Sequence, residues 1–235
     1  MQIVSLSLFR FASLPTRLWA FAMMGLARRP LARHPELQFW KLCGTGVGEG
    51  FTPLPNTGVY AILAVWPGEE SARRQIESSP LWQRYRRVAA EHWTLFLHPI
   101  SARGAWSGRA PFDAGPDTGS GPLAALTRAT IRPRKALRFW TRQPDIGRMI
   151  GANGDVLFKI GIGEVPWFRQ VTVSVWPDEA SMARFARASG PHAEAIRAVR
   201  EGQWFREELY ARFRIAGEAG AWEGRSPRIP KEVTP

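Results

Sequence analysis

Four histidines are the side chains of this sequence best suited to bind a metal or to transfer a proton: His34, His92, His98 and His192. His192 differs from the others because it follows Ser189-Gly190-Pro191 in the middle of an expected helix, where proline interrupts the helical hydrogen bonds. Such a break can direct a side chain into the space between a helix and a sheet. His192 is therefore a candidate axial ligand of a metal or a haem. The alternative is a surface histidine in a first helical turn, and the sequence leaves both open.

Cations recur at matching places in the two halves of the chain: Lys41 matches Lys159, and Arg10 matches Arg128. Each lies among apolar neighbours on an expected strand, and a partly buried cation needs a partner. The partners could be carboxylates of a bound ligand, such as haem propionates. They could instead be carboxylates of the chain, of which two lie nearby in the sequence, Glu49 and Glu164. Ion pairs are favoured in the first half, and the second half is left open.

Motifs of the common hydrolases and phosphate-binding proteins are missing from the sequence. It contains no Ser-His-Asp arrangement and no His-x-x-x-His pair. The run Gly44-x-Gly46-x-Gly48-x-Gly50 resembles a phosphate loop, but it lacks the Lys-Ser/Thr ending and lies between two expected strands. We interpret it as a hairpin turn. The single cysteine, Cys43, excludes an intrachain disulfide and a zinc site built from several cysteines.

Charge and tryptophan content narrow the class of partner. Lys and Arg number 32 against 20 Asp and Glu, which gives a formal charge of +12, and the chain has 11 Trp. Such a protein could bind nucleic acid, an anionic membrane surface or an acidic ligand. The aromatic strand motif of RNA-binding sheets is missing, so no nucleic acid partner is expected. The uncharged run Leu18–Ala27 is too short to cross a bilayer, which needs about 20 apolar residues. We therefore expect a soluble or peripheral protein.

An internal repeat organises these residues. Val65-Trp66-Pro67 recurs as Val175-Trp176-Pro177, and Gly104-Ala105-Trp106 recurs as Gly220-Ala221-Trp222. The position that matches His192 in the first copy is Leu81. A site built on His192 would therefore exist in the second copy only.

Each copy shows the same order of expected elements, which is strand, helix, two strands, helix and strand. The second helix of each copy is expected to run to about Trp93 and Phe205, with a break by proline at Pro80 and at Pro191. The fold class that follows is α+β, a tandem duplication of a ferredoxin-like βαββαβ unit forming a pseudo-dimeric α/β barrel. The strands are expected at 2–11, 37–42, 59–66, 94–101, 123–131, 156–161, 169–176 and 208–216, and the first helices at 15–31 and 134–150.

The repeat also sets the expected domain boundaries. The first ferredoxin-like repeat should cover residues 1–112, and the second, with the proposed active site, residues 122–225. Gly, Pro and polar residues at 113–121 predict a flexible linker. The stretch 226–235 is expected to be a disordered tail.

Several strings of this sequence resemble those of the spheroidene monooxygenases, from Gln2 to about Arg225. They are Leu6-Ser7-x-Phe9-Arg10-Phe11, Phe39-Trp40-Lys41, Gly50-Phe51-Thr52-Pro53, Phe139-Trp140, Phe158-Lys159-Ile160-Gly161-x-Gly163-Glu164-Val165-Pro166, Gln170-Val171-Thr172, Trp176-Pro177 and Ser189-Gly190-Pro191-His192-x-Glu194-Ala195-Ile196-Arg197. The resemblance implies a carotenoid-modifying oxygenase of phototrophic bacteria. It would oxygenate the acyclic carotenoid spheroidene at C2, giving a hydroxy compound and then the ketone spheroidenone.

The resemblance also implies molecular oxygen as co-substrate, a reduced ferredoxin as electron donor, and haem iron as cofactor. His192 would be the metal ligand, and Arg128 and Lys159 would act in catalysis and, with Gln170, in cofactor binding. A saturated or allylic C–H bond is hard to oxidise without such a cofactor. An apolar channel for the polyene would be lined by four aromatic residues, Trp140, Phe158, Trp167 and Phe168. For each aromatic residue, core packing is the alternative.

Other readings of the same fold remain open. One is a module that binds haem or a lipophile without catalysis, and another is a cofactor-free monooxygenase. The charge of +12 suits peripheral contact with a membrane that holds the carotenoid. We therefore expect a cytoplasmic protein that is peripheral on the cytoplasmic face of the inner or photosynthetic membrane.

Overall fold

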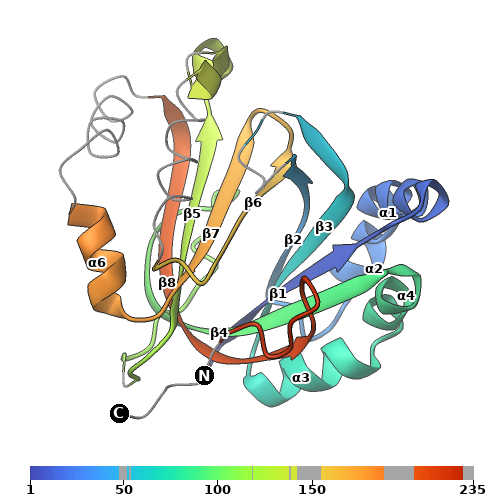
Figure 1. Ribbon diagram of the computed structural model, residues 1–235, viewed down its shortest axis with the longest axis horizontal. Helices are drawn as coiled ribbons and strands as arrows, with labels where there is room; N and C mark the ends of the chain where they lie inside the picture. The colour runs from blue at the N-terminus through green and yellow to red at the C-terminus, as the bar shows by residue number, and fades with distance from the viewer. Residues whose placement is uncertain are drawn as a thin grey trace.

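The computed structural model is a closed barrel of eight antiparallel strands with helices on its outer surface (Figure 1). The strands are β1 (Ile3–Arg10), β2 (Phe39–Gly46), β3 (Pro55–Trp66), β4 (Glu91–Gly104), β5 (Leu123–Ile131), β6 (Phe158–Val165), β7 (Arg169–Trp176) and β8 (Phe205–Gly220). The expected barrel is confirmed. The structure describes residues 1–47, 52, 54–117, 119–137, 139–141, 155–187 and 204–229.

The strands follow the order β1-β3-β2-β6-β7-β5-β8-β4 around the barrel. The first four strands in the chain therefore lie side by side as β4-β1-β3-β2, and the last four lie side by side as β8-β5-β7-β6. The two half-sheets join along β2–β6, where Gly44 pairs with Gly163, and along the longer β4–β8 seam. Closure removes the free strand edges on which other chains could pair.

Alternation along the strands decides which side chains fill the barrel. On β1, Val4, Leu6 and Leu8 point inward into a continuous apolar core, together with Leu126 on β5 and residues of every other strand. Ile3 and Phe9 of β1 belong instead to a second core outside the barrel. The barrel interior is thus packed with side chains, so a ligand site has to lie outside the barrel or at its openings.

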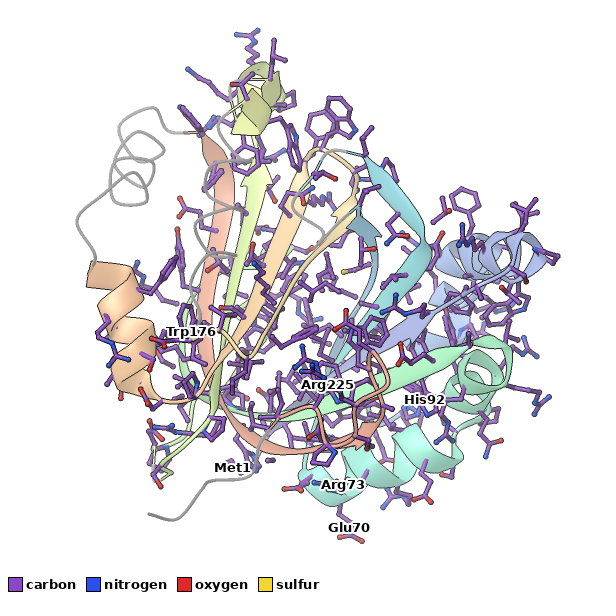
Figure 2. The ribbon with its side chains drawn as sticks, in the orientation of Figure 1. Met1, Glu70, Arg73, His92, Trp176 and Arg225 are labelled. Carbon is purple, nitrogen blue, oxygen red and sulfur yellow. The ribbon has the colours of Figure 1, made fainter. Side chains whose placement is uncertain are left out.

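Helices α1 (Leu14–Leu26), α2 (Arg28–Ala32), α3 (Glu69–Ser78) and α4 (Pro80–Val88) cover the outer face of the first half-sheet, on one side of the barrel in Figure 1. Ser13 and Thr16 form a capping box that starts α1. Pro80 separates α3 from α4, as expected, because it lacks the N–H group needed to continue α3. The 3-10 turn η1 (Pro133–Lys135) and helix α6 (Glu179–Arg187) belong to the second half, and Trp176 packs on Phe185 of α6 at 5.2 Å (Figure 2).

Two expectations about the ends of elements are wrong. The second helix of the first half ends at Val88, not near Trp93, because β4 begins at Glu91 and Trp93 points into the barrel core. Ser226–Ile229 is not a disordered tail: the backbone N–H of Ile229 donates to Glu218 at 3.1 Å, and its side chain is buried in the barrel core. An apolar residue seven positions after the last repeated tryptophan, Trp222, gives no sequence signal of this contact.

The repeated Gly-Ala-Trp strings form two matching turns. Ser107 and Gly108 have φ of 57° and 72°, and Glu223 and Gly224 have φ of 55° and 71°. Positive φ at both central residues defines a type I′ hairpin turn, for which glycine is favoured at the second place. The turns bury Trp106 and Trp222 in the barrel core, at 0% and 3% exposure.

Candidate functional site

Strand register makes the two half-sheets comparable residue by residue. Ile3 pairs with Trp66 in the first half, and Leu123 pairs with Trp176 in the second. The two tryptophans belong to the repeated Val-Trp-Pro strings. Each remaining position on these strands can therefore be matched with its counterpart in the other half by counting from the two pairs.

Helices cover the outer face of the first half-sheet around β1. The hydroxyl of Ser7, at the centre of β1, accepts a hydrogen bond from the indole of Trp82 on α4 at 3.2 Å and contacts Thr94 at 2.9 Å. Phe9 packs on the ring of Tyr85 at 4.9 Å. Ser7 is 0% exposed and Phe9 1%, so no ligand can reach the face at these two positions.

The equivalent face of the second half-sheet carries less bulk. Thr127 matches Ser7 and is exposed, although its strand lies between β7 and β8. Three further positions lose volume relative to their counterparts Phe9, Leu42 and Ile62, and they hold Ala129, Gly161 and Thr172. At these positions the second face therefore carries smaller side chains than the first.

Two of the expected cofactor-binding residues, Lys159 and Gln170, lie on this second face. Lys159 stands between Phe158 and Ile160, which point into the barrel, so its own side chain points outward. Gln170 precedes the inward-pointing Val171 and likewise points outward. The structure thus brings Lys159 and Gln170 to one side of the sheet.

The expected equivalence of Lys41 and Lys159 is wrong. Lys41 pairs with Leu63 across β2 and β3, whereas Lys159 pairs with Ser174 across β6 and β7. The second-half match of Lys41 is Ile160, because the two strands differ in register by one residue from the sequence match. A shift of one residue turns a strand's side chains to the other face, so Lys41 points into the barrel and Lys159 out of it.

Arg128, expected in catalysis and cofactor binding, lies on the opposite face from Lys159 and Gln170. It is 1% exposed, points into the barrel near the ring of Trp106 at 5.8 Å, and forms an ion pair with Glu207. One cofactor cannot contact all three residues because the sheet separates them. Register also places Arg128 two residues deeper than Arg10, which is half-exposed and pairs with Glu91 at 3.0 Å.

A second ion pair lies beside Arg128 in the same end of the barrel. The ammonium of Lys41 is 3.0 Å from Glu164, as expected for an ion-pair partner of the first-half cation. Glu164 also accepts a hydrogen bond from the indole of Trp106 at 2.6 Å. Each buried charge therefore has a partner, which is the condition for tolerating it in an apolar interior.

The type I′ turn after β4 lowers the pKa of Glu207. Burial of this carboxylate would raise the pKa, but backbone N–H groups of Gly108 and Ser107 donate to it at 2.6 and 3.0 Å. These hydrogen bonds and the charge of Arg128 outweigh burial and hold the pKa below 4.5. The carboxylate is thus ionised at neutral pH and keeps Arg128 in place.

Three of the four aromatic residues expected to line a channel come together. The indole of Trp140 donates to the backbone carbonyl of Trp167 at 3.1 Å, and the two rings are 6.5 Å apart. Phe168 follows in the same β6–β7 turn and is partly exposed. Phe158, by contrast, points into the barrel core and packs on Trp93 at 4.8 Å, so it lines no channel.

A cavity of about 320 Å³ lies beside this aromatic group, between α1 and the β2–β3 and β6–β7 connections. Its wall is mostly apolar and includes Phe21, Met24, Leu54 and Trp167, with Gln170 as a polar group. Trp167 is 44% exposed and has a φ of +73°. A tryptophan held in the left-handed region costs about 1–3 kcal/mol and is found mainly where a site requires it. Gln170 lines this cavity and also lies on the outer face of the second half-sheet.

His192 lies outside the described residues, within 188–203, so its predicted role as a ligand stays a prediction. Among the residues that the structure does describe, no group of three or more His, Cys, Asp and Glu could hold a metal ion. No helix in the described part of the chain is long and apolar enough to cross a membrane.

Sequence reasoning missed Glu207 and the part played by Trp106. Glu207 lies in a long alternating strand and has no motif of its own. The repeated Gly-Ala-Trp-x-Gly-Arg string was a usable signal, since a repeated turn that buries a tryptophan must close the same part of each half.

Comparison with known proteins gives one consistent group of relatives. The chain is 53% identical to spheroidene monooxygenase of Cereibacter sphaeroides, over 97% of this chain and 71% of that protein. It is 50% identical to spheroidene monooxygenase of Rhodobacter capsulatus, over 98% and 97% of the two chains. The protein of the same name from Rubrivivax gelatinosus is 37% identical, over 89% and 80%. No protein-family model matches.

Solved structures resemble the fold at low sequence identity. Aldoxime dehydratase in complex with butyraldoxime has a TM-score of 0.60 and 11% identity, over 91% of this chain and 79% of that chain. A second aldoxime dehydratase structure has a TM-score of 0.60 and 10% identity, over 91% and 81%. These similarities concern the barrel fold alone.

Proposed function

Because the chain belongs to the spheroidene monooxygenase family, we propose that it oxygenates the acyclic carotenoid spheroidene at C2, to the hydroxy compound and then to the ketone spheroidenone. The observation that carries this proposal is 50% identity extending over nearly the full length of both chains. An oxidoreductase of the monooxygenase type follows from the family. The substrate, the two successive steps and the position of attack are the proposed part.

The outer face of the second half-sheet is the proposed place of reaction. Support comes from Ala129, Gly161 and Thr172, which are smaller than their first-half counterparts, and from the exposed Thr127. A polyene is apolar and extended, and the aromatic group beside this face suits it. Trp140, Trp167 and Phe168 would orient the chain by ring contacts and exclude water from the reacting end.

A haem is the proposed cofactor, since a C–H bond is hard to oxidise without a redox cofactor. The described residues fit such a group: small residues leave a flat surface, and the outward-pointing Lys159 is a cation for propionates. When bound, haem would supply the activation of molecular oxygen. Gln170 would donate a hydrogen bond to the haem, and His192 is the proposed ligand of its iron. Arg128 would not contact the haem, because it points into the barrel. Its role would be to hold Glu207 against the turn that follows Trp106.

A reduced ferredoxin is the proposed electron donor, and molecular oxygen the co-substrate. The charge of +12 supports both an acidic redox partner and contact with anionic lipid. We place the protein in the cytoplasm, peripheral on the inner or photosynthetic membrane. The two alternatives are a non-catalytic haem- or lipophile-binding module and a cofactor-free monooxygenase of the same fold.

The fold itself carries a further proposal, a tandem duplication of a ferredoxin-like unit. Identical strand orders in the two halves and matched type I′ turns support it. The joint would lie in residues 113–121, between units 1–112 and 122–225. Asp117 in this joint is tied to Arg214 at 2.7 Å, which limits its freedom.

The test is the absorption spectrum of the purified protein together with turnover of spheroidene under oxygen with reduced ferredoxin. We expect a Soret band and ketone formation for the wild type, and loss of both for His192→Ala. His98→Ala is the matched control, because His98 is paired with Glu69 in the first half at 3.3 Å. A colourless active enzyme would establish the cofactor-free alternative, and a coloured inactive protein the binding module.

A further inference from the structure

Helix α1 presents an apolar face to solvent. Leu14, Leu18, Phe21 and Leu26 are 69%, 61%, 69% and 69% exposed. The first three follow the four-then-three spacing of one helix face. The opposite face is buried, with Ala20 and Met23 at 1% and 2% exposure in the core outside the barrel. The exposed leucines therefore do not stabilise the fold, and an apolar surface of this kind marks an interaction site.

The charge around this face is of one sign. The first 35 residues contain five arginines and no aspartate or glutamate. Arg17, Arg28, Arg29 and Arg33 are exposed on or directly after α1. Within the described part of the chain, no carboxylate forms a salt bridge with these four. An apolar helix face bordered by unneutralised arginines is the pattern of a helix that lies in the interface of an anionic membrane.

The apolar face continues beyond α1 onto two neighbouring connections. Leu54 before β3 is 63% exposed, and Trp167 in the β6–β7 turn is 44% exposed. Both line the 320 Å³ cavity, and so does Phe21 of α1. In Figure 1, α1 lies on the right of the barrel, on the side of β3. The mouth of the apolar cavity is thus bordered by the same apolar surface.

We propose that α1 docks on the surface of an anionic lipid bilayer, with Leu14 and Leu18 among the acyl chains and the arginines at the headgroups. This orientation turns the mouth of the cavity toward the lipid, so an apolar substrate can pass into it without crossing water. The purpose of the dock rests on the proposed carotenoid oxygenation, but the dock itself does not. A second copy of this chain is a poorer occupant because it brings like charges together.

Co-sedimentation with vesicles tests the dock on the full chain. Wild-type protein is expected to bind vesicles of phosphatidylcholine with phosphatidylglycerol, and to bind pure phosphatidylcholine vesicles at least about tenfold less tightly. Leu14→Glu with Leu18→Glu should weaken binding to the anionic vesicles at least about tenfold. These side chains are exposed, so a circular dichroism spectrum and melting temperature equal to those of the wild type are expected.

The matched control is Arg103→Gln with Arg225→Gln, which removes the same net charge away from α1. Both arginines are exposed, and Figure 2 shows Arg225 near the lower centre of the view, away from α1. This control should bind anionic vesicles nearly as the wild type does. Equal losses in the two double variants would mean that net charge alone drives binding, and would overturn the proposal.

Turnover separates this proposal from the proposed function. With detergent-solubilised spheroidene the L14E/L18E variant should keep wild-type turnover, and with vesicle-embedded spheroidene it should lose most of it. Wild-type protein that binds anionic vesicles but oxygenates nothing in either form would refute the function and leave the dock standing. Wild-type binding by the L14E/L18E variant would refute the dock, as would a wild-type dimer that the variant converts to a monomer.

Discussion

The same substitution at two equivalent strand positions should have opposite effects if the second half-sheet carries an open site. Ser7 and Thr127 are equivalent, yet Ser7 is fully buried and Thr127 is exposed. In Ser7→Trp, overpacking costs about 1–3 kcal/mol. Loss of the hydrogen bonds to Trp82 and Thr94 costs about 1 kcal/mol each. The total of about 3–5 kcal/mol lowers the melting temperature by roughly 6–20 °C.

Thr127→Trp should leave stability within about 0.5 kcal/mol of the wild type, because an exposed strand position accepts an aromatic residue. Its indole occupies the space assigned to the ligand, so haem content and spheroidene turnover should each fall at least about tenfold, equivalent to about 1.4 kcal/mol. Urea unfolding, the Soret absorbance per protein and product analysis measure the three effects. Destabilisation of T127W equal to that of S7W would refute the open face. Full haem content and turnover in T127W would refute the location of the site.

Three further predictions concern the barrel end and the core. Glu207→Gln leaves Arg128 buried without its partner and should cost about 3–5 kcal/mol in urea unfolding, whereas Glu91→Gln at the half-exposed pair should cost no more than about 1 kcal/mol. Because folding lowers the pKa of Glu207, its ionised carboxylate adds to the free energy of unfolding above pH 4.5, and this part is lost as the pH falls below that value. The E207Q variant should therefore lose less stability than the wild type between neutral and acid pH. An equal loss in the two proteins would contradict this prediction. Gly108→Ala should cost about 1 kcal/mol through its φ of +72° alone, because its added Cβ meets no atom within 4 Å; an equal melting temperature would count against the I′ turn. Cys43 should react with a thiol reagent only after unfolding, since burial and then the charge of Glu164 raise its pKa; fast labelling of the native protein would exclude that burial.

Much of the fold could be predicted because the spacing of apolar residues and the positions of proline indicate the same elements in this sequence. Alternating apolar residues marked the strands, and Pro80 marked the break between two helices. The one-residue error between Lys41 and Lys159 arose because Trp40-Lys41 and Phe158-Lys159 read alike. Only the pairing with β3 and β7 decides which of two adjacent residues points inward.

The site was harder to predict than the fold for a related reason. Arg128 and Lys159 both stand on strands among apolar residues, and sequence alone does not tell the inner face of a barrel from the outer one. Phe158 shows the same difficulty, since a core aromatic and a channel aromatic have the same pattern. Trp140 and Trp167 were predicted together and lie together, because the indole of Trp140 donates to the backbone carbonyl of Trp167 in the β6–β7 turn.

The two halves of the barrel differ in the residues on their outer faces. In the first half, Trp82 covers Ser7 and the sheet face is closed, while α1 of the same half keeps an exposed apolar face. The residue of the second repeat that matches Trp82 is Ala193, next to His192, so the sequence removes bulk at the place where it adds a possible ligand. A symmetric duplicate would need neither change. The asymmetry is therefore best explained by one face kept for stability and membrane contact and the other opened for a ligand, with the cavity at Gln170 between them.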